Sequence, residues 1–186
     1  MNMQHSEKKP LLSRQSFPDR HMIPLFQRAS VTAFRYFTWV SPEAVLNAVS
    51  KPDPDADQRF LLTDADDIAL GLAAHGALKQ SRWIGLDNPD FWRVMQRDWT
   101  DEEYFGPLLE RAGVRTLRTL YKGAQHISMM LQDGKITLKA MDSEGPGTWK
   151  GVKDRRMIVL PAVIDDQALG SAIRAALKMG RPSRVV

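Results

Sequence analysis

Residues 66–82 read DDIALGLAAHGALKQSR, and residues 165–181 read DDQALGSAIRAALKMGR. At a constant offset of 99 positions, ten of the 17 aligned residues are identical. A short apolar run precedes each copy, RFLLT at 59–63 and MIVLPA at 157–162. Self-similarity at a fixed distance is typical of duplicated architectures. The two stretches therefore predict a fold of two halves, each of which ends in a strand followed by a helix.

Both stretches carry the pattern of a half-buried helix, with apolar residues at i, i+3, i+4 and i+7. These residues are Leu70, Ala73, Ala74 and Ala77 in the first copy, and Leu169, Ala172, Ile173 and Ala176 in the second. Gly71 and Gly170 occupy the same place in both copies, although glycine costs a helix about 1 kcal/mol relative to alanine. We expect each glycine to be a point of close contact with a sheet or another helix.

The paired acids at the starts of the two copies admit two interpretations. Asp66-Asp67 and Asp165-Asp166 could serve metal binding or acid–base chemistry. Carboxylates at a helix start also cap free amides and offset the positive end of the helix dipole. The second interpretation explains their repetition without chemistry and is favoured. Thr63 or Asp64 could also cap the first helix.

The other segments predict strands, one short helix and loops. Residues 31–40 favour a strand, and Ser41-Pro42-Glu43 is typical of a helix start. Asp133-Gly134 between HISMMLQ and KITLKAM predicts a two-residue hairpin turn. Further expectations are a loop at 51–58, a helix that opens at Thr100-Asp101-Glu102-Glu103 and ends near Gly113, a strand at 116–123, and a flexible connection at 143–151.

The predicted fold class is α+β. A four-stranded antiparallel sheet followed by a helix accounts for residues 115–179, and a degraded version of the same plan accounts for 31–82. We expect these duplicated halves, about 31–82 and 115–181, to pack into one pseudo-symmetric domain, with a helical connection at 83–113. Residues 29–186 would form this single globular domain, and residues 1–28 a flexible tail.

The composition narrows the function classes. The 186 residues include no cysteine, which excludes disulfides, thiolate metal sites and a cysteine nucleophile. The first residues are polar, and no apolar run approaches the ~20 residues that a membrane span needs. These features favour a cytoplasmic protein that does not interact with the membrane.

The sequence offers little support for catalysis, a metal or a cofactor. No phosphate-binding glycine loop and no HExxH zinc motif is present. His75 faces away from the alanine stripe of its helix and is expected to be exposed. His126 begins a strand, where a single histidine is usually structural or faces solvent. We therefore expect that the chain is not an enzyme.

One segment has the character of a protein-binding surface. Residues 83–105 hold three of the five tryptophans and six acids against two bases. Exposed tryptophans anchor protein interfaces, and carboxylates around them suit a basic partner. The candidate contact residues are Trp92, Asp98, Trp99, Asp101, Glu102 and Glu103. The alternative is that Trp92 and Phe105 belong to the core and that the acids cap helices.

A second segment could bind single-stranded nucleic acid. Residues 106–186 carry fourteen bases and seven acids, and an aromatic ring within a basic stretch can stack on a base. The candidate residues are Trp149, Lys150, Lys153, Arg155 and Arg156. Equally, Trp149 could cover a sheet edge beside solvated lysines, and this interpretation is favoured.

Residues 59–181 resemble the CdiI-type immunity proteins of bacterial contact-dependent growth inhibition systems. The resemblance rests on Leu70-Gly71, Ala77-Leu78 and Ser81-Arg82, and on the closing pattern Trp149, Met157-Ile158-Val159-Leu160-Pro161-Ala162, Asp166, Ala168-Leu169-Gly170, Ala172 and Ala176-Leu177. It implies a cytoplasmic protein without catalytic activity that binds and blocks the C-terminal toxin domain of a cognate CdiA protein. Such toxins are often nucleases. We expect the chain to be a monomer or a homodimer. Nucleic acid would be a partner of this chain itself only under the alternative function, single-stranded nucleic-acid binding.

Overall fold

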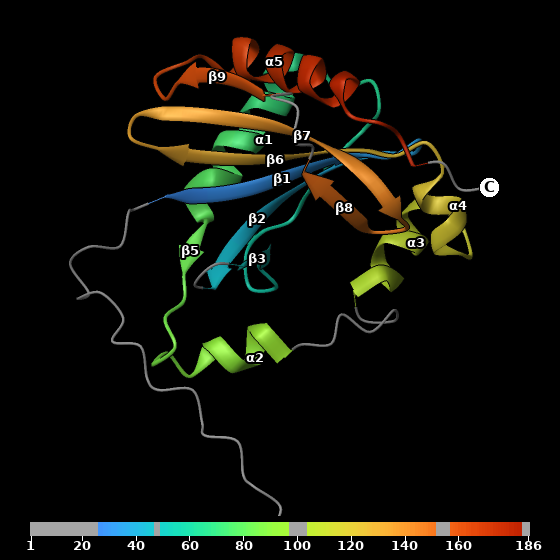
Figure 1. The fold of residues 1–186 in the computed structure, drawn as a ribbon. Coiled ribbons are helices and arrows are strands. Elements are labelled where there is room, and N and C mark those ends of the chain that lie inside the picture. Colours follow the sequence, from blue (N-terminus) through green and yellow to red (C-terminus); the bar gives the residue numbers. More distant parts are fainter. Residues whose placement is uncertain (1–25, 47–48, 97–103, 152–156, 184–186) are drawn as a thin grey trace, which may run out of the picture.

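The computed structural model describes residues 26–46, 49–96, 104–151 and 157–183. These residues form an α+β fold, as predicted. Nine strands in the described part make one sheet, whose central order is β3-β2-β1-β6-β7-β8. Helices α1 (Asp67–Gln80) and α5 (Asp166–Met179) lie together on one face of the sheet (Figure 1). No helix within the described ranges is long and apolar enough to span a membrane.

The first half of the sheet is organised around β2 (Thr38–Leu46). This strand pairs antiparallel with β1 (Gln27–Ala33). Its C-terminal end pairs with β3 (Val49–Pro52), and its N-terminal end with β4 (Arg59–Leu61). The first half therefore consists of one long strand with three antiparallel neighbours, followed by α1.

The second half is organised in the same way around β7 (Lys135–Gly145). This strand pairs with β6 (Gln125–Gln132) along most of its length, with β8 (Thr148–Gly151) at its C-terminal end and with β9 (Met157–Pro161) at its N-terminal end. β1 and β6 join the halves as an antiparallel pair in which Ser30 faces Ser128. The order of pairing is thus alike in the two halves, while duplication with pseudo-symmetry stays a prediction.

Helices α1 and α5 begin in the same way. The side chain of Asp66 accepts a hydrogen bond from the Ala69 amide at 2.7 Å, and Asp165 accepts one from Ala168 at 2.7 Å. The helix-start interpretation of these acids is confirmed, and the expectation that Thr63 or Asp64 caps α1 is wrong. Each cap satisfies an amide that the first helical turn leaves without a partner.

The repeated glycines lie where α1 and α5 cross. A Cβ atom on Gly71 would lie 1.8 Å from the carbonyl oxygen of Asp166, and one on Gly170 would lie 1.9 Å from that of Asp67. Real Cβ atoms do not approach backbone so closely, so only glycine permits this crossing. The prediction of close glycine contacts is confirmed, and the partner of each helix is the other helix.

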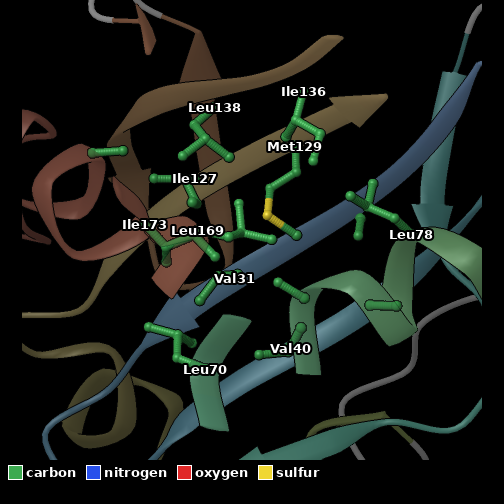
Figure 2. Close-up of a cluster of buried hydrophobic side chains, with 14 of the residues drawn as sticks. Val31, Val40, Leu70, Leu78, Ile127, Met129, Ile136, Leu138, Leu169 and Ile173 are labelled. Carbon is green, nitrogen blue, oxygen red and sulfur yellow. The ribbon is translucent and has the colours of Figure 1, made fainter. Parts of the chain in front are cut away.

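The main core fills the space between the sheet and the two helices (Figure 2). Strands contribute Val31, Val40, Ile127, Met129, Ile136 and Leu138, and the helices contribute Leu70, Leu78, Leu169 and Ile173. All ten side chains are buried. Alternate residues of the central strands point to this face, as expected of a sheet covered on one side by helices.

Two smaller clusters hold the remaining elements. α3 (Gly106–Ala112) and α4 (Leu117–Tyr121) pack around an aromatic cluster that includes Phe34, Phe37 and Trp39. β5 (Arg82–Trp83) pairs parallel with β2, and α2 (Asp90–Gln96) follows it. α2 lies well apart from α3 and α4 in Figure 1.

Two predictions for residues 31–46 are wrong. Residues 31–40 form the β1–β2 hairpin rather than one strand, with the Phe34 amide bonded to the Phe37 carbonyl at 2.9 Å. Ser41-Pro42-Glu43 lies inside β2 and not at a helix start. Pro42 is tolerated because β2 changes partners here, from β4 up to Val40 to β3 from Glu43.

Two predictions for the C-terminal half are also wrong. The run 116–123 contains helix α4, because Thr116 caps the Thr119 amide and Leu120 and Tyr121 bury themselves in the aromatic cluster. Residues 143–151 form the β7–β8 hairpin instead of a flexible connection. Gly147 has a φ of 73° in its turn, a conformation that glycine adopts without strain.

Other boundaries agree with the sequence. Asp133 and Gly134 both have positive φ, 49° and 70°, which confirms the hairpin turn between β6 and β7. Helix α3 ends at Ala112, next to Gly113, as predicted, and Gly113 has the left-handed conformation. The predicted opening of that helix at 100–103 lies outside the described residues, as does most of the tail 1–28. β1 nevertheless begins at Gln27, two residues before the expected boundary at 29.

Candidate partner-binding surface

The segment from Arg82 to Gln96, called the β5–α2 unit below, exposes large apolar side chains. Trp83 is 43% exposed, Leu86 44% and Trp92 55%. The ring of Phe91 lies beneath that of Trp92 in an edge-to-face contact, with ring centroids 5.2 Å apart. Exposed large apolar side chains mark protein interaction sites when they gather on one surface. This unit is the strongest candidate for a protein contact.

The unit is anchored to the sheet by its buried side chains. Ile84, Phe91 and Val94 pack with Ala44 and Leu46 of β2 in a small apolar cluster. The Ile84 amide also donates to the Val45 carbonyl at 2.9 Å. α2 therefore has an inward apolar face that fixes it and an outward face that carries Trp92.

A cluster of ions fastens the same unit to the loop between β3 and β4. Arg82 donates to both carboxylate oxygens of Asp53, at 2.5 and 3.0 Å. It also donates to Asp55 at 2.5 Å and to Asp90 at 3.4 Å. Asp53 is 1% exposed, so its charge is compensated by this forked contact.

Arg93 of α2 completes the cluster. It donates to both oxygens of Asp55 and, at 3.2 Å, to Asp90. The hydrogen bond from Arg93 is the main cause that lowers the pKa of Asp55, and the contact raises the pKa of Arg93 in turn. Two arginines and three aspartates thus tie α2, β5 and the β3–β4 loop together, so that Trp92 is presented on a fixed support.

The structure describes one of the six candidate contact residues, and their role in binding stays a prediction. Trp92 is on the exposed face of α2, so the alternative that it belongs to the core is wrong. Phe105 does pack, half-buried, against the aromatic cluster. Asp98, Trp99, Asp101, Glu102 and Glu103 lie outside the described residues.

Comparison with known protein families decides the class of the chain. The family model described as "CdiI: CDI immunity protein" matches residues 27–180. The chain belongs to the CDI immunity protein family. The match includes every described strand and helix, and therefore also the β5–α2 unit.

Solved structures share the fold of this family member. A protein of unknown function from Neisseria meningitidis matches with a TM-score of 0.78 at 19% identity, covering 84% of this chain and 96% of that chain. A chain of the CdiA-CT/CdiI toxin and immunity complex from Yersinia pseudotuberculosis matches with a TM-score of 0.73 at 22% identity, covering 84% and 98%. A comparison with curated proteins found no significant match.

The candidate nucleic-acid residues are only partly described in this CdiI family member. Trp149 is half-buried, and its ring stacks on that of His126 with centroids 4.8 Å apart. Lys150 bonds Glu144 at 2.9 Å. One face of the indole is therefore covered and the neighbouring charge is paired. Lys153, Arg155 and Arg156 lie outside the described residues.

The two internal histidines have structural partners. His75 was expected to be exposed, which is wrong: it is half-buried, and its Nδ1 lies 2.6 Å from an oxygen of Asp166. Arg174, at the equivalent place in α5, bonds Asp67 at 2.6 Å. His126 Nδ1 lies 2.8 Å from the Thr32 hydroxyl, and burial lowers its pKa to about 3.

The described ranges contain no group of three or more His, Cys, Asp or Glu side chains arranged for a metal ion. The ion cluster at the β5–α2 unit was missed in the sequence, because its members come from three separate segments. The signals that could have found it were the acids of KPDPDADQ and the arginine of Ser81-Arg82. The repeat equivalent of this arginine, Arg181, instead bonds Asp142 through its backbone amide at 2.8 Å.

Proposed function

We propose that the chain binds the C-terminal toxin domain of a cognate CdiA protein and neutralises it in the cytoplasm, with no catalysis of its own. The match of residues 27–180 to the CDI immunity protein family carries this proposal. The likeness to a chain of a toxin and immunity complex supports it. The growth-protecting role requires a tight complex, since free toxin acts on the cell that contains it.

The β5–α2 unit would be the centre of the toxin contact. Trp92 offers a large exposed ring, and the ion cluster ties its helix to the β3–β4 loop, which would lower the entropic cost of binding. A nanomolar dissociation constant corresponds to about −12 kcal/mol. An interface that supports such affinity is expected to exceed ~1,000 Å², so Trp83 and Leu86 would also be covered.

The chemistry of the toxin would be that of a nuclease. The five residues that follow α2 in the candidate set, Asp98, Trp99, Asp101, Glu102 and Glu103, add four carboxylates next to the exposed aromatic unit in sequence. A nuclease cleft is basic because it binds phosphates, and carboxylates would occupy it in their place. The chain would then inhibit by covering the cleft.

Single-strand nucleic-acid binding by the chain itself has less support. Among its described candidates, Trp149 stacks on His126 and Lys150 pairs with Glu144. A basic face that holds nucleic acid needs free cations and an open aromatic ring. The toxin is therefore the preferred partner.

The proposal is tested by titration of the purified chain with the C-terminal domain of the CdiA protein encoded next to it. We expect a stoichiometric complex of nanomolar affinity. Trp92→Ala should weaken it by roughly 30-fold or more, the loss of about 2 kcal/mol at an interface anchor. Val163→Ala is the matched control, because Val163 is 96% exposed and lies between β9 and α5, outside the β5–α2 unit.

Three results would contradict the proposal at different levels. The absence of any complex would remove the immunity function. Equal toxin affinity of Trp92→Ala and the wild type would show that the β5–α2 unit is not the centre of the toxin contact. A toxin domain that binds the chain but cleaves neither RNA nor DNA would remove the nuclease assignment alone.

A further inference from the structure

Helix α1 has an exposed apolar face that its repeat partner α5 lacks. Ile68 is 52% exposed and Leu72 is 62% exposed. The equivalent positions of α5 are Gln167 and Ser171, which are also exposed. The two helices have the same length, the same cap and the same glycine crossing. The fold therefore does not require apolar residues at these positions, and α5 serves as an internal control for that conclusion.

The exposed apolar residues of α1 lie on one stripe. At about 100° per residue, Ile68, Leu72 and Lys79 fall within about 40° of one another around the helix axis. Gly76 borders the stripe, and no atom lies within 4 Å of the position that a Cβ would take there. This helix face is thus apolar in its first half, open at Gly76 and positively charged at its C-terminal end.

We propose that this face of α1 binds the same face of a second copy of the chain, with the two helices antiparallel and a two-fold axis near Leu72. Ile68 of each copy would then face the open position at Gly76 of the other. Asp64, exposed just before α1, would approach Lys79 of the other copy at both ends. Such a face is self-complementary in shape and in charge, as a two-fold interface must be.

The charges select the second copy as the occupant. Asp64 precedes the positive end of the helix dipole, and Lys79 lies in the last turn, at the negative end. Antiparallel alignment therefore places opposite charges and opposite helix ends together. Parallel alignment would oppose like charges. One helix face is small beside the ~800 Å² that each partner contributes to a standard interface. The dimer is therefore expected to be reversible and dependent on concentration.

Sedimentation of the full chain, without toxin, from micromolar to millimolar concentration tests this inference. The wild type should shift from monomer towards twice the monomer mass. Ile68→Gln with Leu72→Ser, which copies the residues of α5 and so preserves the helix, should stay monomeric. Val163→Ser, a polar substitution at a more exposed apolar residue outside α1, should dimerise as the wild type does.

A charge exchange gives the sharper result. Asp64→Lys alone and Lys79→Asp alone should each weaken dimerisation several-fold, and the two together should restore it. A wild type that stays monomeric throughout the range would overturn the inference. A dimer that forms equally well with Ile68→Gln and Leu72→Ser would also overturn it. If the wild type is monomeric and this double substitution lowers the toxin affinity, the face binds the toxin instead. Because toxin is absent from the main experiment, its outcome is independent of the proposed function.

Discussion

Alanine substitution at two glycines of the same helix should have opposite effects on stability. At Gly71 a Cβ would lie 1.8 Å from the Asp166 carbonyl oxygen, whereas ordinary contact begins near 3.4 Å. The two helices would have to separate locally by roughly 1.5 Å. Overpacking of this kind costs about 3 kcal/mol, and the gain in helix propensity returns about 1 kcal/mol. Gly71→Ala should therefore destabilise the fold by about 2 kcal/mol.

Gly76 provides the matched control, because a Cβ there meets no atom within 4 Å. Gly76→Ala should stabilise the fold by about 0.5–1 kcal/mol through helix propensity alone. In thermal unfolding, Tm should fall by roughly 4–8 °C for Gly71→Ala and rise by roughly 1–4 °C for Gly76→Ala. Circular dichroism and calorimetry on the purified chain would measure both.

The repeat supplies a second check on the same reasoning. Gly170→Ala should resemble Gly71→Ala, since its Cβ would lie 1.9 Å from the Asp67 carbonyl oxygen. The double variant should lose less than the sum of the two, because the first substitution already separates the helices. Equal Tm shifts for Gly71→Ala and Gly76→Ala would refute the close crossing of α1 and α5.

Two further predictions concern charged and titratable groups. Arg82→Met should destabilise the fold by about 2 kcal/mol in urea unfolding, because Asp53 stays buried without its partner. Arg93→Met, at the exposed end of the cluster, should cost much less, because solvent screens its ion pairs. Equal losses would contradict the burial argument. Burial lowers the pKa of His126 from 6.5 to about 3. As pH falls from about 6.5 towards 3, the unfolded chain therefore binds a proton that the folded chain does not. The free energy of unfolding should fall over this range by at most ~1.4 kcal/mol per pH unit. His126→Gln should flatten that slope, and an unchanged slope would show that other groups cause it.

The parts of the fold that could be predicted were those with a local or repeated signal. The repeat identified α1, α5, their acidic caps and the glycine crossing. Asp133-Gly134 identified the hairpin between β6 and β7. In each case the residues that determine the structure are close together in the sequence or occur in both copies of the repeat. The prediction for one copy then supports the prediction for the other.

The failures occurred where distant contacts override a local signal. Ser41-Pro42-Glu43 has the residues of a helix start, yet β1 pairs with this stretch from across the hairpin. The run 116–123 alternates weakly like a strand, but α4 forms because Leu120 and Tyr121 reach the aromatic cluster with Phe34. His75 appeared exposed because its helix was considered alone, and α5 brings Asp166 to it.

The candidate contact surface was predictable in part for the same reason. Trp92 was found from composition, since aromatic residues gathered in one segment are visible without a structure. Its support was not found, because Asp53 and Asp55 lie 29 and 27 residues before Arg82 and meet it only after β3, β4 and β5 have paired around β2. Family membership, in turn, rested on the repeat and the closing strand and helix.

Growth of cells that produce the toxin tests the central claim most directly. The C-terminal domain of the protein encoded immediately upstream would be induced with and without this chain. The account predicts that the domain stops growth alone, that the chain restores growth, and that Val163→Ala restores it equally while Trp92→Ala protects less at matched expression. Growth arrest that persists in the presence of well-expressed, folded chain would contradict the immunity function.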